Sequence, residues 1–169
     1  MVTGIKPNRA HYALAKLERA LRLTAVVTQN IDGLHQLAGS RNVYELHGSI
    51  YRNHCMECGK SYTVEQLKDM PNVPICGCGG VIKPDVVLYE EGLDADTLRA
   101  AITHITRADM LIVGGTSLNV YPASGLIDYY KGNKLALINK SETPYDYRAD
   151  LIINDSIGMA LDKATEGLE

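Results

Sequence analysis

The chain has 169 residues, 46% of them hydrophobic, which is enough to bury the core of one ordinary domain carrying a small inserted module. Seventeen basic and twenty acidic side chains leave a formal net charge of −3, so the composition gives no electrostatic footprint for nucleic acid or an anionic membrane. No apolar run is long enough to cross a bilayer and no signal-peptide core begins the chain, so a cytoplasmic protein without nucleic-acid or membrane partners is expected.

The first half of the chain predicts one helix, two strands and a segment of different character. Apolar residues recur at helical spacing over residues 10–21, and Asn8 is a plausible N-cap for this helix. Residues 24–28 and 43–46 predict short strands. From residue 50 to residue 82 the sequence is polar and loop-like around its cysteines, so this segment is expected to form a separate module.

The second half alternates strands and helices. Residues 85–89 are interpreted as a buried strand, and 94–105 as a helix whose apolar side chains share one face. The remaining elements are predicted as strands at 110–113, 135–139 and 151–153, a helix at about 123–130, and a last helix after residue 153. Such alternation predicts an α/β fold, a parallel sheet covered on both faces, with ligands bound at the carboxyl ends of its strands.

Four cysteines occur in two close pairs. Cys55 and Cys58 form a CxxC motif, Cys76 and Cys78 form a CxC motif, and seventeen residues separate Cys58 from Cys76. Two such turns can converge on one tetrahedral zinc ion, and four thiolates leave no coordination position for water, so the predicted zinc is structural. The alternatives are four cysteines of no special role and a redox CxxC, although a redox motif normally opens a helix and needs no second pair.

Polar side chains follow two of the predicted strands. Gln29, Asn30 and Asp32 come directly after the strand at 24–28, where open sheets place ligand-binding groups. His47 follows the strand at 43–46 and precedes a glycine, and an imidazole at that edge can act as a general base. Taken alone, the loop could equally be one whose Asn and Asp satisfy backbone groups, and a lone histidine is more often structural.

Six motifs in fixed order resemble the sirtuins, the family of NAD-dependent protein lysine deacylases, and the ending looks bacterial. In chain order these motifs are TQNIDGLHQLAG, ELHGS, the paired cysteines, KPDVVLYEE, GGTSLNVYPA and INK followed by TPYDYRAD. The resemblance implies that NAD is cleaved with release of nicotinamide and that the acyl group passes from a protein lysine to ADP-ribose.

The resemblance also implies roles for individual residues. His47 is the general base that activates a ribose hydroxyl after the acyl oxygen has attacked C1′ of the nicotinamide ribose. The residues expected to contact NAD are Gln29, Asn30, Asp32, Gly115, Thr116, Ser117 and Asn139, and among them Asp32 is expected to recognise the carboxamide. The residues expected to line the trough for an acyl-lysine peptide are Val87, Tyr89 and Val120. Each has a plain alternative: the GGTS sequence as a helix-entry cap, Asn139 as a turn residue, and the valines as ordinary core.

The chain departs from the family pattern in two places. A sirtuin normally begins with a further segment that carries a GAGxS phosphate loop and an arginine-bearing lid, and neither sequence occurs in these 169 residues. The fold expected is therefore an incomplete doubly wound, Rossmann-like parallel sheet from residues 1–49 and 83–169, with the zinc-ribbon module at 50–82. We expect NAD affinity to fall without the helix N-terminus that binds pyrophosphate. The second departure is Glu90, where the family commonly has glycine, so the loop is expected to bend differently.

Two other functions stay open on the sequence alone. A non-catalytic zinc-bearing interaction module could be completed by another chain, or by a second copy that pairs with the exposed sheet to give a homo-oligomer. ADP-ribosyl transfer uses the same cleavage of NAD with a different acceptor.

Overall fold

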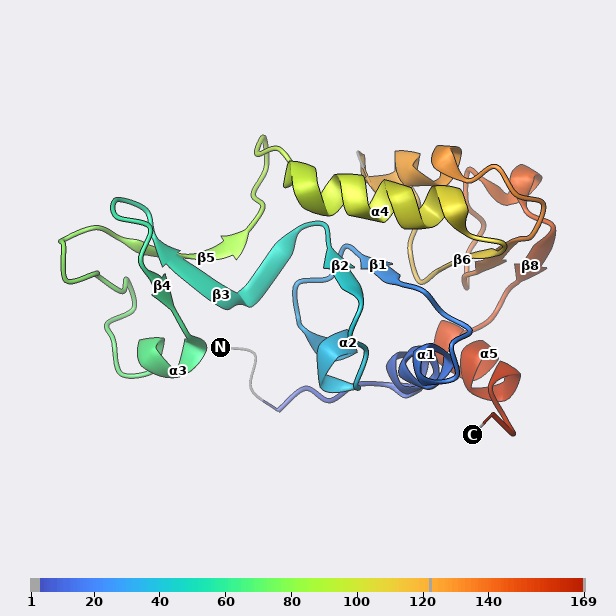
Figure 1. Ribbon diagram of the computed structural model, residues 1–169, viewed down its shortest axis with the longest axis horizontal. Helices are drawn as coiled ribbons and strands as arrows, with labels where there is room; N and C mark the ends of the chain where they lie inside the picture. Colours follow the sequence, from blue (N-terminus) through green and yellow to red (C-terminus); the bar gives the residue numbers. More distant parts are fainter. Residues whose placement is uncertain (1–3, 122, 169) are drawn as a thin grey trace.

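The structure, a computed structural model, describes residues 4–121 and 123–168 (Figure 1). The first elements along the chain are α1 (Arg9–Arg19), β1 (Val26–Thr28), α2 (Leu34–Leu37), β2 (Val43–Glu45), β3 (Gly48–Cys55), β4 (Ser61–Tyr62), α3 (Val64–Leu67) and β5 (Ile82–Val86). They are followed by α4 (Ala95–Arg107), β6 (Leu111–Gly114), the 3₁₀ helix η1 (Ala123–Tyr129), β7 (Leu135–Ile138), the 3₁₀ helix η2 (Asp146–Arg148), β8 (Leu151–Ile153) and α5 (Ile157–Ala164).

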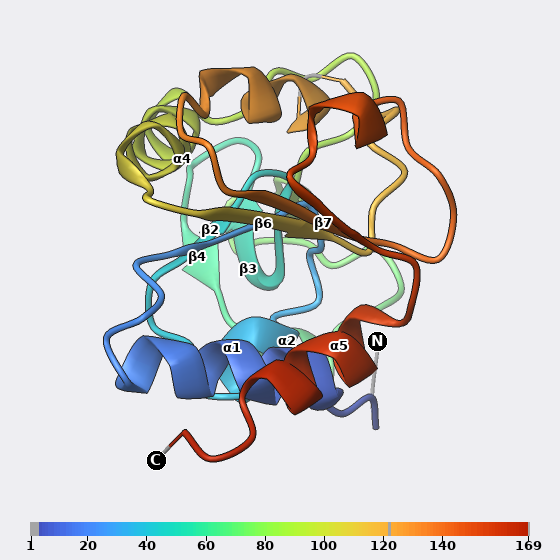
Figure 2. The ribbon, with the colours of Figure 1, turned by 90° about the vertical axis from the view of Figure 1, so that its right-hand side faces the viewer.

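The larger part of the molecule is built on parallel strands, as the alternation of strands and helices predicts. β1 pairs in parallel with β2, and β7 pairs in parallel with both β6 and β8. Helices α1, α2 and α5 lie on one side of these strands and α4 and η1 on the other (Figure 2). These strands form two sheets rather than one, with the orders β1-β2 and β6-β7-β8. Within the described residues, β1 and β6 each have a strand partner on one side only.

The two longest helices form where their sequences predict, but α1 ends at Arg19, so Leu21 at the end of the predicted apolar face is 91% exposed. The Asn8 side chain accepts hydrogen bonds from the backbone at the start of α1, and the His11 ring accepts one from the Asn8 backbone, which completes a capping box. Asp94 caps α4 through a hydrogen bond from the Thr97 backbone N–H. Ala101 and Ile105 of α4 are buried, so the apolar face predicted for this helix is confirmed.

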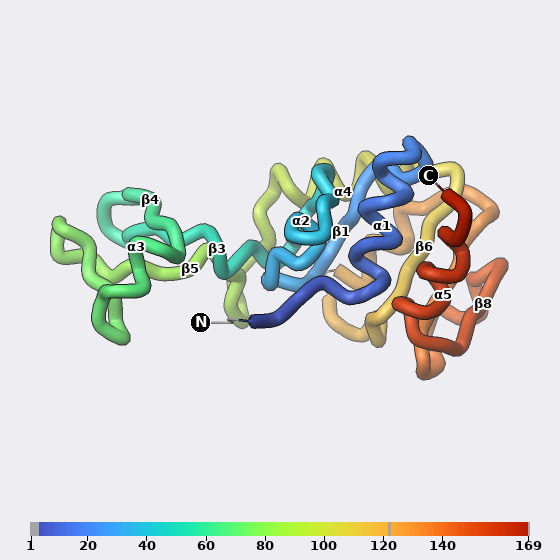
Figure 3. Tube along the Cα trace, turned by 90° about the horizontal axis from the view of Figure 1, so that it is seen from below, coloured from blue at the N-terminus to red at the C-terminus, as the bar shows by residue number. Residues whose placement is uncertain are grey.

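The segment around the cysteines contains more regular structure than its polar sequence predicts. β3, β4 and β5 form an antiparallel sheet in the order β4-β3-β5, and the short helix α3 follows β4. This part projects from one end of the molecule (Figure 3). The prediction of a loop-like segment is wrong because the buried positions of β3 are Ser49, Asn53 and Cys55, which are small or polar, so the strand shows little of the hydrophobic alternation that marks a strand. The ladder between β3 and β5 begins with the pair Gly48 and Val86 and ends with the pair Cys55 and Ile82.

Two other predicted elements need correction. The strand interpreted as 85–89 ends at Val86 and lies in the antiparallel sheet, and Tyr89 beyond its end is fully exposed. The helix predicted at 123–130 is the 3₁₀ helix η1.

Three hydrophobic clusters form the core. The largest lies between the parallel strands and the pair α4 and η1, the second joins α1 and α5 to the other face of β7 and β8, and the third lies within the cysteine-bearing sheet. No helix in the described ranges 4–121 and 123–168 is long and apolar enough to cross a membrane.

Candidate functional site

The polar loop after β1 is held by hydrogen bonds to its own backbone. The Thr28 hydroxyl accepts from the Asn30 backbone N–H at 3.1 Å, and the Asp32 carboxylate accepts from the Leu34 N–H at 3.0 Å. Asn30 is exposed, whereas Gln29 and Asp32 are half-buried. These bonds are compatible with the structural alternative for the loop, but they leave the Gln29 and Asn30 amides free to face a ligand.

His47 lies against this loop. Its Nδ1 atom is 3.0 Å from the main-chain oxygen of Gln29, and because a carbonyl oxygen only accepts, Nδ1 must carry the proton. This contact leaves Nε2 without a partner in the ring's hydrogen bond, and an unprotonated Nε2 is what a general base requires. On the backbone, the His47 oxygen accepts a hydrogen bond from the Val87 N–H, which brings the predicted peptide-binding segment to the same corner.

Two further histidines lie behind the loop. The rings of His11 and His35 are 4.6 Å apart, and His35 Nδ1 is buried without a hydrogen-bond partner. Burial lowers the pKa of both rings, that of His35 to about 4, although the charge of Asp32 opposes the shift. Both rings are therefore neutral at pH 7. Sequence reasoning used neither ring, and their spacing along the chain gives no signal that they meet.

The GGTS sequence forms the turn after β6. Gly115 and Leu118 have positive φ angles of 65° and 56°, and the Thr116 hydroxyl accepts from the Leu118 backbone N–H at 3.2 Å. Leu118 belongs to the same core cluster as Leu46, the residue before His47. The turn is thus anchored to the core that also supports His47. Ser117 is exposed at its surface.

Asn139 stands apart from these groups in its contacts. It follows β7, and its side-chain N–H donates to the Ser141 main-chain oxygen at 2.9 Å. That bond is the one expected of a turn residue. Its role toward a cofactor therefore stays a prediction.

Two of the three residues predicted to line a peptide trough are exposed. Tyr89 is fully exposed and Val120 is 54% exposed, while Val87 is half-buried beside His47. The alternative that Val120 is core is therefore wrong. Glu90 adopts a φ of 70°, a left-handed conformation that normally favours glycine. That it bends the loop differently from the family's glycine stays a prediction.

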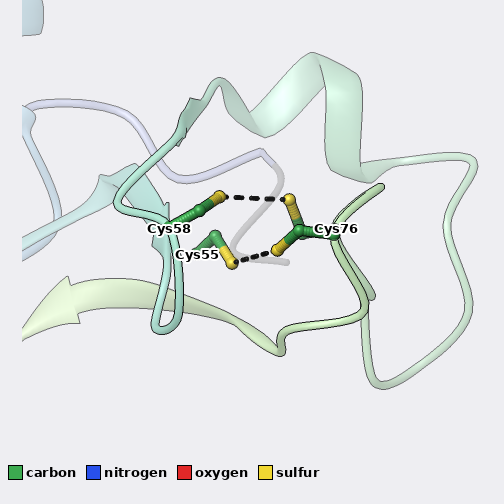
Figure 4. Close-up of side chains that lie close together, drawn as sticks. Cys55, Cys58 and Cys76 are labelled. Atoms are coloured by element: carbon green, nitrogen blue, oxygen red, sulfur yellow. Dashed lines mark hydrogen bonds between the residues drawn. The ribbon is translucent and has the colours of Figure 1, made fainter.

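The four cysteines converge at one point of the cysteine-bearing sheet (Figure 4). Cys55 and Cys78 Sγ atoms are 3.5 Å apart, those of Cys58 and Cys76 are 3.7 Å apart, and all four lie within 4.8 Å of one another. Thiolates at about 2.3 Å from a tetrahedral zinc would be separated by roughly 3.8 Å. The cluster therefore fits a tetrahedral four-sulfur ion such as zinc, and the observed separations exceed any disulfide length.

Tyr62 hydrogen-bonds one of these sulfurs from inside the module. Its hydroxyl donates to Cys76 Sγ at 3.0 Å, and its ring is buried. Hydrogen bonds from the Cys78 backbone and from Tyr62 lower the pKa of Cys76 to about 6. Sequence reasoning did not find this residue. Tyr62 is close in sequence to Cys58, but its hydroxyl reaches Cys76, and the spacing does not reveal that contact.

We expect the Tyr62→Phe variant to hold zinc less tightly than the wild type, because it loses a hydrogen bond to a charged sulfur but keeps its ring. Such a bond contributes about 1.5–3 kcal/mol, which corresponds to release at least about tenfold faster. Transfer of zinc to a chromogenic chelator measures this rate. The exposed Tyr147→Phe variant is the matched control, and equal rates for all three proteins would remove Tyr62 from metal retention.

Comparison with known proteins places the chain in a family. A family model described as the Sir2 family matches residues 1–122. A protein of Clostridium acetobutylicum named NAD-dependent protein deacetylase is 65% identical over 159 residues, which cover 93% of this chain and 65% of that protein. A protein of Clostridium tetani with the same name is 59% identical over 165 residues, which cover 96% of this chain and 67% of that protein. The chain spans about two thirds of the length of these curated relatives.

Solved structures agree with this placement. A Sir2 structure described as a complex with p53 peptide and NAD⁺ has a TM-score of 0.88 at 44% identity, covering 95% of this chain and 70% of that one. Another, described as Sir2 bound to acetylated peptide, gives the same TM-score, identity and coverage. The family model, the sequence relatives and the solved structures all lead to one conclusion: the chain belongs to the Sir2 family.

Proposed function

We propose that this chain carries the chemistry of an NAD-dependent protein lysine deacylase, in which nicotinamide is released and the acyl group passes to ADP-ribose. Membership of the Sir2 family and the names of its relatives support the reaction class. The observation that carries the proposal is the hydrogen bond between His47 Nδ1 and the Gln29 main-chain oxygen, which fixes the ring and frees Nε2.

The polar groups on two strand ends would hold NAD and its reacting ribose. NAD supplies an electrophilic C1′ carbon once nicotinamide leaves, together with the ADP-ribose that receives the acyl group. Gln29, Asn30 and Asp32 would contact the nicotinamide and ribose, with Asp32 at the carboxamide. The GGTS turn and Asn139 would contact the rest of the cofactor, and His47 Nε2 would take the proton from a ribose hydroxyl.

The exposed surface beside His47 would take the acylated substrate. The backbone hydrogen bond from Val87 to His47 and the exposure of Tyr89 and Val120 support a peptide that adds as a strand between them. The partners proposed are thus acyl-lysine proteins.

We propose that the cysteine cluster holds a structural zinc. Its four sulfurs satisfy a tetrahedral ion and leave no open coordination position, so the ion takes no part in the reaction. The two parallel sheets are proposed to be parts of a Rossmann-like fold, supported by their parallel pairing and by helices on both faces (Figure 2).

The His47→Ala variant should lose deacylation of an acetyl-lysine peptide by roughly 10²- to 10⁴-fold at saturating NAD, because it removes the general base. Nicotinamide exchange, which precedes the action of this base, should fall less. Product formation followed by mass spectrometry measures the first step and labelled nicotinamide the second. His104→Ala is the control, since this half-buried histidine bonds Tyr44 on the other face. Unchanged deacylation by His47→Ala would contradict the assignment.

A second candidate function is a non-catalytic interaction module, favoured by two features. The 169 residues contain no GAGxS sequence, and within the described residues β1 and β6 each have one edge without a strand. Both features also lead us to propose that these residues by themselves bind NAD weakly, which would impair catalysis.

Titration calorimetry with NAD separates the two candidates. The enzyme proposal predicts measurable binding with a dissociation constant of roughly 1 mM, weakened further in Asp32→Ala. Micromolar affinity would contradict the proposed impairment. Absence of any binding at several millimolar NAD, together with a stable folded oligomer, would favour the interaction module.

A further inference from the structure

The pairing between β3 and β5 is interrupted beside His47. Ser49 pairs with Asp85 and Asn53 pairs with Pro84, so the three residues between Ser49 and Asn53 face no residue of β5. These residues, Ile50, Tyr51 and Arg52, are named here the β3 bulge. A bulge redirects its side chains and backbone groups away from the ladder.

The first two bulge residues contact the polar loop. The Ile50 N–H donates to the Ile31 main-chain oxygen at 3.1 Å, which ties the bulge to the middle of the loop. The Tyr51 ring lies on Gly33, where an added Cβ would come within 2.9 Å of the ring, and Gly33 also has a φ of 65°. Only glycine allows this approach without movement.

The third bulge residue contacts the strand that carries His47. Arg52 Nη1 donates to Glu45 Oε2 at 2.7 Å, and Arg52 Nε donates to Asp85 Oδ2 at 3.2 Å. The Glu45 side chain is only 5% exposed, so its charge depends on this partner, whereas Asp85 is about half exposed. Burial alone would lower the pKa of Arg52, but its bonds to the two carboxylates raise it.

The three charged groups span a gap between the cysteine-bearing sheet and the parallel strands. They line a cavity of about 410 Å³, which also includes Lys83 and Glu91. Lys83 pairs with Glu91, so Arg52 is the cation that Glu45 depends on.

The corner between β2 and β3 is short and tightly built. Glu45 precedes His47 by two residues, and β3 begins at Gly48, where an added Cβ would lie 1.8 Å from the Asp85 main-chain oxygen. A change in the position of β3 would consequently be transmitted to the His47 ring. It would also be transmitted to Gln29, through the bond between Ile50 and Ile31.

We infer that the β3 bulge positions both partners of the bond between His47 and Gln29, with Arg52 as a positioning residue that couples the cysteine-bearing sheet to the catalytic corner. The inference rests on the proposed function for its kinetic consequence. Its structural content, the coupling of Arg52 to the polar loop, stands on the contacts described above. An exposed ion pair alone contributes little, so the buried Glu45 is what gives Arg52 this role.

The kinetic test compares Arg52→Met and Arg52→Lys with the wild-type chain at saturating NAD. Arg52→Met keeps the aliphatic stem and should lower kcat for deacylation roughly 10- to 100-fold through misplacement of His47, with KM for NAD within about twofold. Nicotinamide exchange should fall less than deacylation, whereas loss of folded protein would reduce both in proportion. Arg52→Lys can still pair with Glu45 and should recover part of the rate. Arg99→Met, which removes an exposed ion pair on α4, should match wild type.

Hydrogen exchange tests the coupling independently of activity. The Ile50 amide should exchange about tenfold faster in Arg52→Met than in Arg99→Met, because its bond to Ile31 is no longer supported. Unchanged exchange at Ile50 would overturn the inference, as would proportional loss of both reaction steps. If the wild-type chain showed no turnover while Ile50 exchange still responded to Arg52→Met, the proposed function would fail and the coupling would stand.

Discussion

The hydrogen bond between the His47 ring and the Gln29 carbonyl depends on how β1 and β2 pair. Thr28 lies opposite Glu45 in the parallel ladder, and the Leu46 N–H donates to the Thr28 oxygen, so the residues after each strand meet at one edge. A slip of the register by one residue would turn the His47 side chain to the other face of the sheet. The chemistry proposed for this chain thus rests on a three-residue strand pair, and the core cluster that includes Leu46 holds that pair in place.

The cysteine-bearing sheet has too few apolar residues to hold its own shape. Its core consists of Cys55, Tyr62, Cys76 and Ile82, and two of these are proposed metal ligands. A core of this size is marginal without a cross-link, so a bound ion would supply much of its stability. Because β3 runs from the cysteines to the residue after His47, order at the metal would reach the catalytic corner through one strand. A structural ion can in this way affect a reaction in which it takes no part.

The elements with strong periodicity could be predicted from sequence, and the contacts between elements could not. The α1 and α4 helices show their apolar faces directly in the spacing of residues, and α1 also shows its cap, Asn8. The cysteine pairs likewise predict that four sulfurs converge. The β3 strand carries no clear signal because its buried positions are Ser49, Asn53 and Cys55 rather than large apolar residues, and the apolar run at 85–89 does not reveal that the ladder ends at Val86.

The site itself shows the same division. Strand ends locate Gln29 and His47 on one edge, but only the structure shows which ring nitrogen of His47 is bonded and that His11 and His35 pack behind the loop. The sequence does not point to Arg52. Its partners Glu45 and Asp85 are separated from it along the chain by intervals that belong to no local motif. Which residues form ion pairs across a bulge depends on the geometry of the backbone there, and this geometry cannot be read from the residue types alone.

The tautomer of His47 tests the central claim most directly. Long-range ¹H–¹⁵N correlation spectra of the zinc-loaded chain at neutral pH distinguish a protonated from an unprotonated ring nitrogen. The bond to the Gln29 oxygen requires the proton on Nδ1, and the role of general base requires that Nε2 carries none. A spectrum with the proton on Nε2, or with the two tautomers in rapid exchange, would show that the ring is not held for the role assigned to it.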